Sequence, residues 1–306
     1  MKLAHSPITY HHFANLSFHL KRDDLLHPQF SGNKARKFMA LFEGQYSTIT
    51  TLISYGSAQA NSLYSLAALA RLRNWQLEFY VDHIPAWLKV KPIGNYRAAQ
   101  ELGARIIETR PLGEHHPRDY IAQIRQPDDS CLFVEEGGRS TIAEQGVTQL
   151  ANELLAWIEQ QPKQAWRVAL PSGTGTTALF LHKALSEYDI YDIEVVTCPC
   201  VGGEAYLVEQ CIELGETSHP VIINASSKHR FGRLYQQDYE IWLALHNQTG
   251  VEFDLLYDPL MWRSLLEWLP TQPHKSLIYI HQGGLLGNES MLPRYRRQFG
   301  KNEQQE

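Results

Sequence analysis

Short runs of β-branched and other apolar residues alternate along this chain with longer stretches in which apolar residues recur every three or four positions. The short runs predict strands and the longer stretches predict amphipathic helices, because side chains repeat with a period of 2 in a strand and about 3.6 in a helix. The expected strands are residues 51–54, 77–81, 105–108, 131–134, 166–170, 194–197, 221–224 and 277–280. The expected helices are residues 62–73, 95–102, 141–159, 178–187, 204–214, 239–248 and 261–269.

This alternation predicts an α/β fold in which parallel sheets carry helices on both faces. Ligands in such folds bind beyond the carboxyl ends of the strands, so the loops at those ends are the candidates for chemistry. Near the amino end, residues 10–20 have a short, strand-like pattern. The polar tail beyond Met291, rich in Arg and Gln, is expected to fray.

A lysine at the start of an apolar run is the first candidate for chemistry. Lys34 follows the polar turn that begins at Ser31 and precedes the apolar run 38–42, which is typical of the first turns of a helix. A free lysine has a pKa of about 10.4, and burial beside a cofactor is the usual way to free its amine for Schiff-base chemistry. An ordinary solvated lysine fits the same local pattern.

The loop 172–177, with the sequence Ser-Gly-Thr-Gly-Thr-Thr, lies between an expected strand and an expected helix. Its glycines let backbone N–H groups turn toward a ligand, and its hydroxyls and the helix amino terminus favour an anion, so the loop predicts a phosphate site. An ordinary capped turn is the alternative. Gly173, Gly175 and Ala178 also satisfy the loose dinucleotide fingerprint, but the following strand ends in Thr197 instead of a ribose-binding carboxylate.

Two further loops follow expected strands and should lie at the same edge of a sheet. The first contains Gln59 and Asn61, and Asn61 could either contact a ligand or cap its own helix. The second is the glycine-rich segment 281–287, where flexible backbone could approach a ligand closely.

Composition narrows the partner to a small molecule. The chain has 306 residues, 43% of them hydrophobic and 20% charged, with a net charge of −5 that gives no basic field for nucleic acid. No apolar run is long enough for a membrane span, and the amino end lacks a secretory pattern, so the cytoplasm is the expected location. Four cysteines are too few and too irregular for a disulfide scaffold, and the histidines form no cluster at ligand spacing, so no metal is expected.

Taken together, these stretches resemble the fold-type II pyridoxal-phosphate (PLP) enzymes, and most closely the family of 1-aminocyclopropane-1-carboxylate (ACC) deaminase and D-cysteine desulfhydrase. The matching segments run from Lys21-Arg22-Asp23-Asp24 through Ser31-Gly32-Asn33-Lys34 to the final glycine loop. The resemblance implies that Lys34 forms a Schiff base with PLP and that Asn61 donates to the phenolic oxygen of the cofactor. It also implies that the phosphate is held by Ser172, Gly173, Thr174, Gly175 and Thr176.

The same resemblance implies two domains with the cofactor in the cleft between them. The smaller α/β domain would comprise residues 38–144, inserted into a larger cofactor domain made of residues 1–37 and 145–306. A homodimer is also implied.

The chain departs from the family pattern in two of the loops. Where the family usually reads Gln-Ser-Asn-His, this chain has Gln59, Ala60, Asn61 and Ser62, so the hydroxyl expected near the substrate is absent at 60 and another is present at 62. Gln282 stands where a threonine is expected beside the pyridine nitrogen. A glutamine amide can donate to that nitrogen but cannot keep it protonated as a carboxylate would.

A third departure concerns a tyrosine. The segment that begins at Asp258 resembles the family's Asp-Pro-Val-Tyr, and Met261 occupies its tyrosine position, which predicts that a catalytic tyrosine is missing. Tyr257 could substitute, although an aromatic residue there is more often part of the core. Tyr235, in a segment similar to another family loop, is a further candidate.

The resemblance implies a PLP-dependent enzyme that deaminates or eliminates from a small amino acid, either ACC or a D-cysteine-like substrate. A racemase or a β-eliminase on another amino acid fits the same residues. So does a PLP-binding protein without catalysis. A nicotinamide-dependent oxidoreductase that uses the Gly173 loop is the alternative from another class of enzyme.

Overall fold

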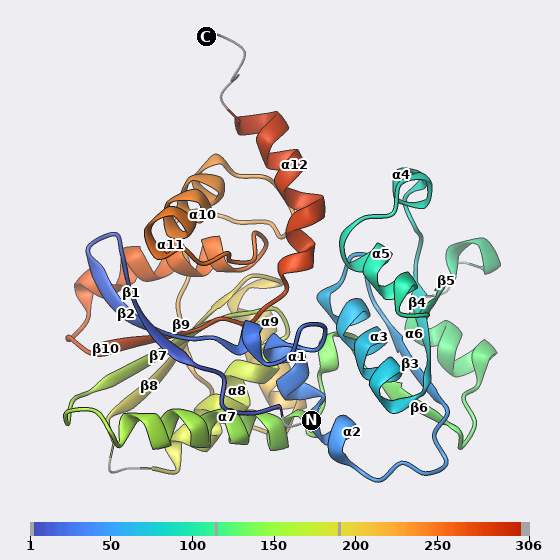
Figure 1. Cartoon of the computed structure of the whole chain (residues 1–306), viewed down its shortest axis with the longest axis horizontal. Helices are drawn as coiled ribbons and strands as arrows, with labels where there is room; N and C mark the ends of the chain where they lie inside the picture. The colour runs from blue at the N-terminus through green and yellow to red at the C-terminus, as the bar shows by residue number, and fades with distance from the viewer. Residues whose placement is uncertain (1–2, 114–115, 189–190, 301–306) are drawn as a thin grey trace.

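The computed structural model describes residues 3–113, 116–188 and 191–300, which form two sheets (Figure 1). The larger sheet has six strands in the order β1-β2-β10-β7-β8-β9, all parallel except for the antiparallel β1–β2 pair. These strands are β1 (Ile8–Phe13), β2 (Leu16–Lys21), β10 (Ser276–Ile280), β7 (Trp166–Ser172), β8 (Ile193–Pro199) and β9 (Val221–Ile222).

The smaller sheet is entirely parallel and has four strands in the order β5-β4-β3-β6. They are β3 (Thr51–Tyr55), β4 (Gln76–Val81), β5 (Arg105–Glu108) and β6 (Cys131–Val134). The predicted α/β fold with parallel sheets is thereby confirmed. The smaller sheet comes from one continuous segment of the chain, whereas strands of the larger sheet lie on both sides of that segment in the sequence. The division at residues 38 and 144 stays a prediction.

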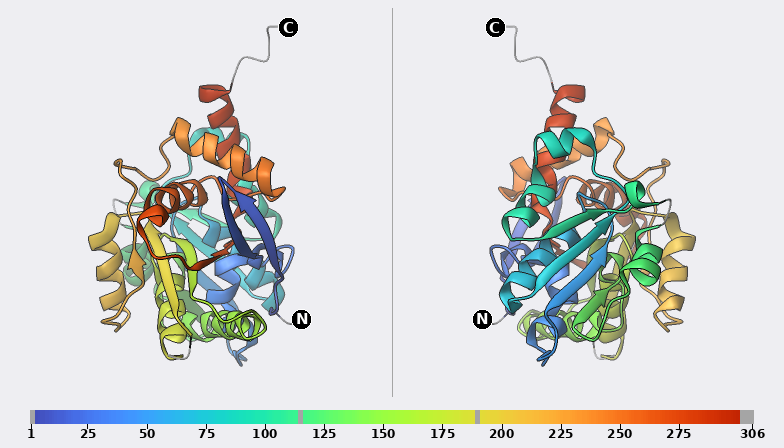
Figure 2. Two further views of the ribbon diagram at one scale, coloured as in Figure 1. Left: turned by 90° about the vertical axis from the view of Figure 1, so that its left-hand side faces the viewer. Right: turned by 90° about the vertical axis from the view of Figure 1, so that its right-hand side faces the viewer.

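Helices cover both faces of the larger sheet (Figures 1 and 2). One face packs against α7 (Ala143–Ile158) and α8 (Thr176–Ser186), and the other packs against α10 (Gln236–Thr249), α11 (Asp258–Trp268) and α12 (Asn288–Phe299). Strand β10 shows the alternation, because Ile278 and Ile280 face the first group while Leu277 and Tyr279 face the second. Burial on both faces explains why the strands are nearly continuous apolar runs in the sequence.

The smaller sheet packs mainly against α3 (Asn61–Arg73) and α5 (Gly94–Glu101). The short helices in the described part of the chain are α1 (Gly32–Lys37), α2 (Met39–Glu43), α4 (Ala86–Val90) and α6 (Pro117–Tyr120), and α9 (Gly203–Glu213) follows β8. Helix α1 contacts both α7 and α3, so it lies between the cores of the two sheets. No helix among the described residues combines the length and the apolar character that a bilayer crossing requires.

The expectation for the carboxyl end of the chain was wrong, and the strand-like pattern expected near the amino end is confirmed but contains a turn. The segment 10–20 is a hairpin, because Ala14 and Asn15 adopt positive φ angles of 47° and 65° and reverse the chain. The tail beyond Met291 is helical as far as Phe299, and Met291 and Tyr295 are buried against α10 and α11. Only one side of α12 is apolar, so its overall polarity concealed its place in the fold. Residues beyond 300 lie outside the described part.

Candidate active site

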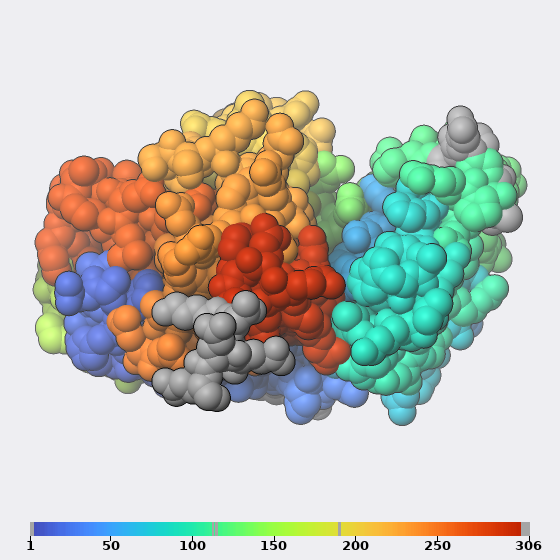
Figure 3. All heavy atoms as spheres, turned by 90° about the horizontal axis from the view of Figure 1, so that it is seen from above, coloured from blue at the N-terminus to red at the C-terminus, as the bar shows by residue number. Residues whose placement is uncertain are grey.

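A cavity of about 370 Å³ lies where the strand-end loops of both sheets meet. Figure 3 shows the surface hollowed between the lobe that carries α4 and α5, in cyan, and the lobe that carries α10 and α12, in orange and red. The lining includes every predicted site residue except Tyr235. These lining residues are Lys34, Gln59, Ala60, Asn61, Ser62, Ser172, Gly173, Thr174, Gly175, Thr176, Tyr257 and Gln282.

Lys34 lies within α1, which begins at Gly32, six residues earlier than the apolar run suggested. Gly32 has a φ of +65°, and a Cβ there would lie 1.9 Å from the backbone oxygen of Gln282, so only glycine allows this contact between α1 and the last glycine loop. The backbone N–H of Asn33 donates to the same oxygen at 3.1 Å. This contact places Lys34 directly beside the strand-end loop after β10.

A second lysine, Lys37, lies one helical turn after Lys34 and lines the same cavity. Burial lowers the pKa of Lys34 to about 8, and burial together with the neighbouring Lys34 lowers the pKa of Lys37 well below its usual value. The Lys37 ammonium donates to the backbone oxygen of Gly137. The sequence analysis missed Lys37, although its spacing of three residues from Lys34 was a visible signal.

A buried ion network fixes the rotation of α1. The Arg36 guanidinium, fully buried on the side of α1 away from the cavity, donates to Asp23 at 2.8 and 2.9 Å and to Glu153 at 2.7 and 2.8 Å. Lys21 donates to Glu153 at 2.6 Å, so two cations balance two carboxylates. Because Arg36 is held from β2, its following turn and α7, Lys34 and Lys37 point toward the cavity.

The loop after β7 has the geometry of an anion site. Gly175 adopts a φ of +74°, and a Cβ there would lie 2.3 Å from Leu207, so the turn into α8 requires glycine. The hydroxyls of Thr174 and Thr176 lie 3.0 Å apart, and the buried Thr177 hydroxyl has no partner among the described residues. The Thr177 hydroxyl, one of the two hydroxyls of the Thr174–Thr176 pair and the first N–H groups of α8 can therefore donate to a phosphate.

The Gln59–Asn61 loop presents amides to the cavity from the other sheet. Asn61 is the first residue of α3, and its Nδ2 donates to Asp254 at 3.3 Å while its Oδ1 accepts from Asn95 at 2.7 Å. Asn61 therefore does not act as a helix cap. Both polar atoms of the Gln59 amide are buried without a partner among the described residues, as expected of a group that binds a ligand. Ala60 and Ser62 lie on either side of Asn61 in the lining.

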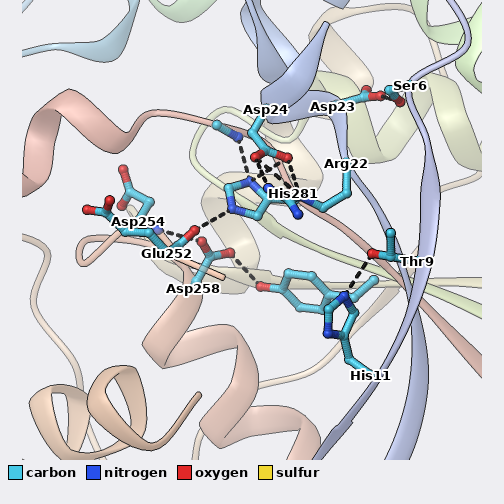
Figure 4. A network of polar contacts seen from close by, with 12 residues as sticks. Ser6, Thr9, His11, Arg22, Asp23, Asp24, Glu252, Asp254, Asp258 and His281 are labelled. Atoms are coloured by element: carbon cyan, nitrogen blue, oxygen red, sulfur yellow. Dashed lines mark hydrogen bonds and ion pairs between the residues drawn. The ribbon is translucent and has the colours of Figure 1, made fainter. Parts of the chain in front are cut away.

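Gln282 lies opposite this loop, after β10. Its Nε2 donates to the backbone oxygen of Pro171 at 2.6 Å, and its Oε1 is buried without a partner among the described residues. His281 is buried behind it and lies beside Asp24, with 3.6 Å between Nδ1 and Oδ1 (Figure 4). Glutamine thus bridges the β7 and β10 loops and leaves an acceptor for a ligand.

The region around Asp258 presents one tyrosine, Tyr257, to the cavity. Tyr257 lines the cavity beside Gly173, whereas Met261 is fully buried in the core under α11. The reason is that α11 begins at Asp258, so position 261 lies in its first turn and faces the sheet. Asp254 and Tyr257 have the same spacing as the first and last residues of Asp-Pro-Val-Tyr. That Tyr257 substitutes for the family tyrosine stays a prediction.

Tyr235 lies outside the cavity lining. Its hydroxyl accepts a hydrogen bond from the backbone N–H of Arg230 at 3.0 Å, and its ring stacks on His229. These contacts hold the Tyr235 side chain within the loop before α10. The geometry therefore does not support a catalytic role for Tyr235.

Two buried carboxyls in the lining were also missed, Asp254 and Asp258 (Figure 4). Burial raises the pKa of Asp254 to about 6, and burial together with the charge of Asp254 raises the pKa of Asp258 to about 8. Asp258 accepts from the Tyr279 hydroxyl at 2.6 Å and from the backbone N–H of Asp254 at 2.9 Å. Burial, followed by the Asp254 charge, also raises the pKa of Tyr257, so its phenol stays protonated.

These residues fit PLP. The cavity offers a lysine for its aldehyde, a glycine and hydroxyl cradle for its phosphate, and buried amide and hydroxyl groups at Gln59, Thr177 and Gln282 whose polar atoms lack partners among the described residues. A protein rarely buries so many unpaired polar groups unless a ligand satisfies them.

The two parallel sheets and the cavity between them define the fold of the fold-type II PLP enzymes. A solved structure described as an ACC deaminase homologue matches 97% of this chain and 95% of its own, with a TM-score of 0.77 and 18% identity. A PLP-dependent aspartate racemase matches 91% of this chain and 90% of its own, with a TM-score of 0.64 and 14% identity. The predicted fold class is confirmed.

Two curated relatives with known sequence similarity indicate which fold-type II enzymes this chain resembles. A protein of Oryza sativa subsp. japonica with the provisional name D-cysteine desulfhydrase 2, mitochondrial, is 22% identical over 94% of this chain and 82% of its own length. A protein of Thermotoga maritima, provisionally named 1-aminocyclopropane-1-carboxylate deaminase, is 23% identical over 89% of each chain. No family model matches. The predicted resemblance to the ACC deaminase and D-cysteine desulfhydrase family is confirmed by these two names.

Proposed function

We propose that this chain is a PLP-dependent enzyme that deaminates or eliminates from a small amino acid, with ACC and D-cysteine as the first candidate substrates. The observation that carries the proposal is the meeting of a lysine of lowered pKa with the phosphate cradle and unpaired polar groups in one cavity. The names of the curated relatives support the two candidate substrates.

When bound, PLP would withdraw electron density from the α-carbon of an amino acid. Lys34 would hold the cofactor's aldehyde, and its amine, once released by substrate, is placed to take or return a proton. Because burial lowers its pKa to about 8, about a tenth of this amine is unprotonated at pH 7, far more than for a free lysine. The Tyr257 phenol keeps its proton and can donate it to a leaving group.

The size of the cavity favours a small substrate. Its volume of about 370 Å³ lies near the lower end of the range for small-molecule sites, roughly 300–1,000 Å³, and PLP itself must occupy part of it. Ala60 removes a hydroxyl from the loop that faces the substrate, whereas Ser62 and Ser57 keep hydroxyls in the same lining. We infer that substrate contacts in this loop differ from those of the family pattern.

The cofactor assignment can be tested with the purified protein incubated with PLP and then reduced with borohydride. A visible absorption band that disappears on reduction, with the fixed adduct mapped to Lys34, is expected. Lys34→Ala should lose the adduct, while Lys89→Ala, at an exposed lysine paired with Glu108, should keep it. An absent adduct in the wild-type protein would refute the proposal and leave the glycine loop as a site for another phosphate ligand.

The substrate can be tested by product analysis with D- and L-amino acids. Both candidate substrates should release ammonia, and only D-cysteine should also release sulfide. Inversion of a chiral amino acid without ammonia would indicate a racemase instead. A Lys34 adduct with no spectral change and no product from any amino acid would indicate a PLP-binding protein without catalysis.

We also propose that the protein is a homodimer of the cytoplasm. Light scattering on the purified protein should then give twice the chain mass of 35.1 kDa. A mass equal to that of one chain would contradict the dimer.

A further inference from the structure

The Asn61 side chain is held at both ends of its amide by residues outside its own loop. Its Nδ2 donates to Oδ2 of Asp254 at 3.3 Å, and its Oδ1 accepts from Nδ2 of Asn95 at 2.7 Å. Asp254 and Asn95 are both almost fully buried, with 3% and 1% exposure. Solvent therefore does not compete strongly for either contact.

Each of these two partners is restricted to one role. Oδ1 of Asp254 accepts from the backbone N–H groups of Leu256 at 2.6 Å and Tyr257 at 3.0 Å, and an ionised carboxylate can only accept. Nδ2 of Asn95 also donates to the backbone oxygen of Gln59 at 2.9 Å, and a carbonyl can only accept, which fixes the amide nitrogen of Asn95 on this side. Both contacts therefore require the Asn61 amide in one orientation.

This orientation has a consequence for a ligand. Asp254 lines the main cavity and Asn95 lines a smaller cavity of about 200 Å³, while Lys34 and Asn61 line both of these cavities. The amide nitrogen of Asn61 therefore lies on the side of Asp254, which lines the main cavity, and its carbonyl oxygen lies on the side of Asn95. Only one hydrogen of this NH₂ group is used by Asp254, so the second remains to be donated.

We propose that Asp254 and Asn95 are positioning residues that hold the Asn61 amide as a hydrogen-bond donor toward an ionised oxygen of the ligand bound at Lys34. This inference rests on the proposed function, in which that oxygen is the phenolic oxygen of PLP. A flipped Asn61 would present its carbonyl oxygen and repel the ionised oxygen instead.

Asp254→Asn is the sharpest perturbation because it keeps shape and removes the obligatory acceptor. The new amide can still accept from Leu256 and Tyr257 through its oxygen, which leaves an NH₂ group facing the NH₂ group of Asn61. Asn61 then has a donor facing it from each side and cannot satisfy both. Asn95→Ala removes the other constraint independently.

The readout is the absorption spectrum of the PLP-loaded protein at one fixed pH, which reports the ratio of ionised to neutral phenolic oxygen. Loss of one hydrogen bond to a charged group should lower this ratio about tenfold in Asp254→Asn. The decrease in Asn95→Ala should be smaller, because Asp254 still accepts from Nδ2 of Asn61. Asp192→Asn, at an exposed carboxylate paired with Lys275, is the matched control and should leave the ratio unchanged. In an Asn61→Ala background, Asp254→Asn should change the ratio less than twofold further.

Borohydride reduction of every variant separates this inference from the proposed function. If wild-type protein forms no adduct at Lys34, the proposed function fails. If adducts form and both Asp254→Asn and Asn95→Ala keep the wild-type ratio, the positioning role is refuted. Circular dichroism shows whether Asp254→Asn folds. If it does not, the absorption spectra of Asn95→Ala and of the double variant Asn61→Ala/Asn95→Ala test the positioning role instead.

Discussion

Glu153→Gln tests whether the buried ion network stabilises the α1 helix that carries Lys34. The Glu153 carboxylate accepts from both Arg36 and Lys21, at 2.6 to 2.8 Å, and its side chain is 5% exposed. The substitution keeps the shape and removes the charge. It leaves two buried cations with only one carboxylate, Asp23, and an uncompensated buried charge is strongly destabilising.

The pKa of Glu153 gives the magnitude. Burial disfavours the ionised carboxylate, but Arg36 and Lys21 outweigh burial and lower the pKa from 4.5 to about 2. A difference of about 2.5 units corresponds to about 3 kcal/mol of folding free energy at neutral pH. Because the folded-state pKa lies below the unfolded one, this contribution is complete above pH 4.5 and is lost as the pH falls toward 2; roughly half remains at pH 3.

Thermal unfolding followed by circular dichroism at several pH values from 7 to 3 measures the effect. Glu153→Gln should unfold about 5 °C below the wild type at pH 7, and the gap should narrow as the pH falls. The control is Glu101→Gln, which removes an exposed carboxylate paired with Arg97 and should change stability by about 0.5 kcal/mol or less. Equal unfolding temperatures for the two variants at pH 7, or a gap that stays constant down to pH 3, would refute the reasoning.

Three further predictions concern the cavity itself. The rate at which PLP reacts with cofactor-free protein should rise with pH around a midpoint of about 8, the lowered pKa of Lys34. Stopped-flow absorbance measures this rate, and a midpoint near 10 would contradict the lowered pKa. Gly32→Ala should lower the free energy of unfolding by at least about 2 kcal/mol, and should lower the PLP content too, because the new Cβ meets the backbone of Gln282. The control is Gly103→Ala, at a φ of +90° with nothing within 4 Å, which should lose only the smaller part of the free energy that comes from backbone strain. Tyr257→Phe should keep the Lys34 adduct but reduce turnover about 100-fold or more, and unchanged turnover would exclude a proton-donating role.

The fold was largely readable from the sequence because the central strands, such as β7, are buried on both faces and form apolar runs, and because the edge strands still stand out as short β-branched or apolar runs. The runs at β5 and β6 coincide with the observed strands Arg105–Glu108 and Cys131–Val134. Errors came where a local conformation overrides the pattern. The Ala14–Asn15 turn contains no glycine, and α12 is strongly polar apart from the side that contacts α10 and α11.

The candidate site was predictable where chemistry and local pattern coincide. Lys34 and the loop around Gly175 could be read from residue type and flanking periodicity. Asp254 could not, because its role depends on contacts with Asn61, 193 positions away in the chain. Lys37 was readable in principle, since residues three apart share a helix face, but the two-lysine pattern was not used.

Gln282 shows how the structure changes the meaning of a departure that the sequence revealed. From the sequence, its amide nitrogen was expected to donate to the pyridine nitrogen. In the structure this Nε2 donates to the Pro171 carbonyl, and the unpartnered atom is the acceptor Oε1. An acceptor beside a pyridine nitrogen favours the protonated ring, although a neutral amide does so less strongly than a carboxylate. Since Tyr257 lines the cavity as well, Ala60 is left as the departure that removes a polar group from the cavity lining. We therefore expect the difference from the family pattern to be greatest in the loop that holds Ala60.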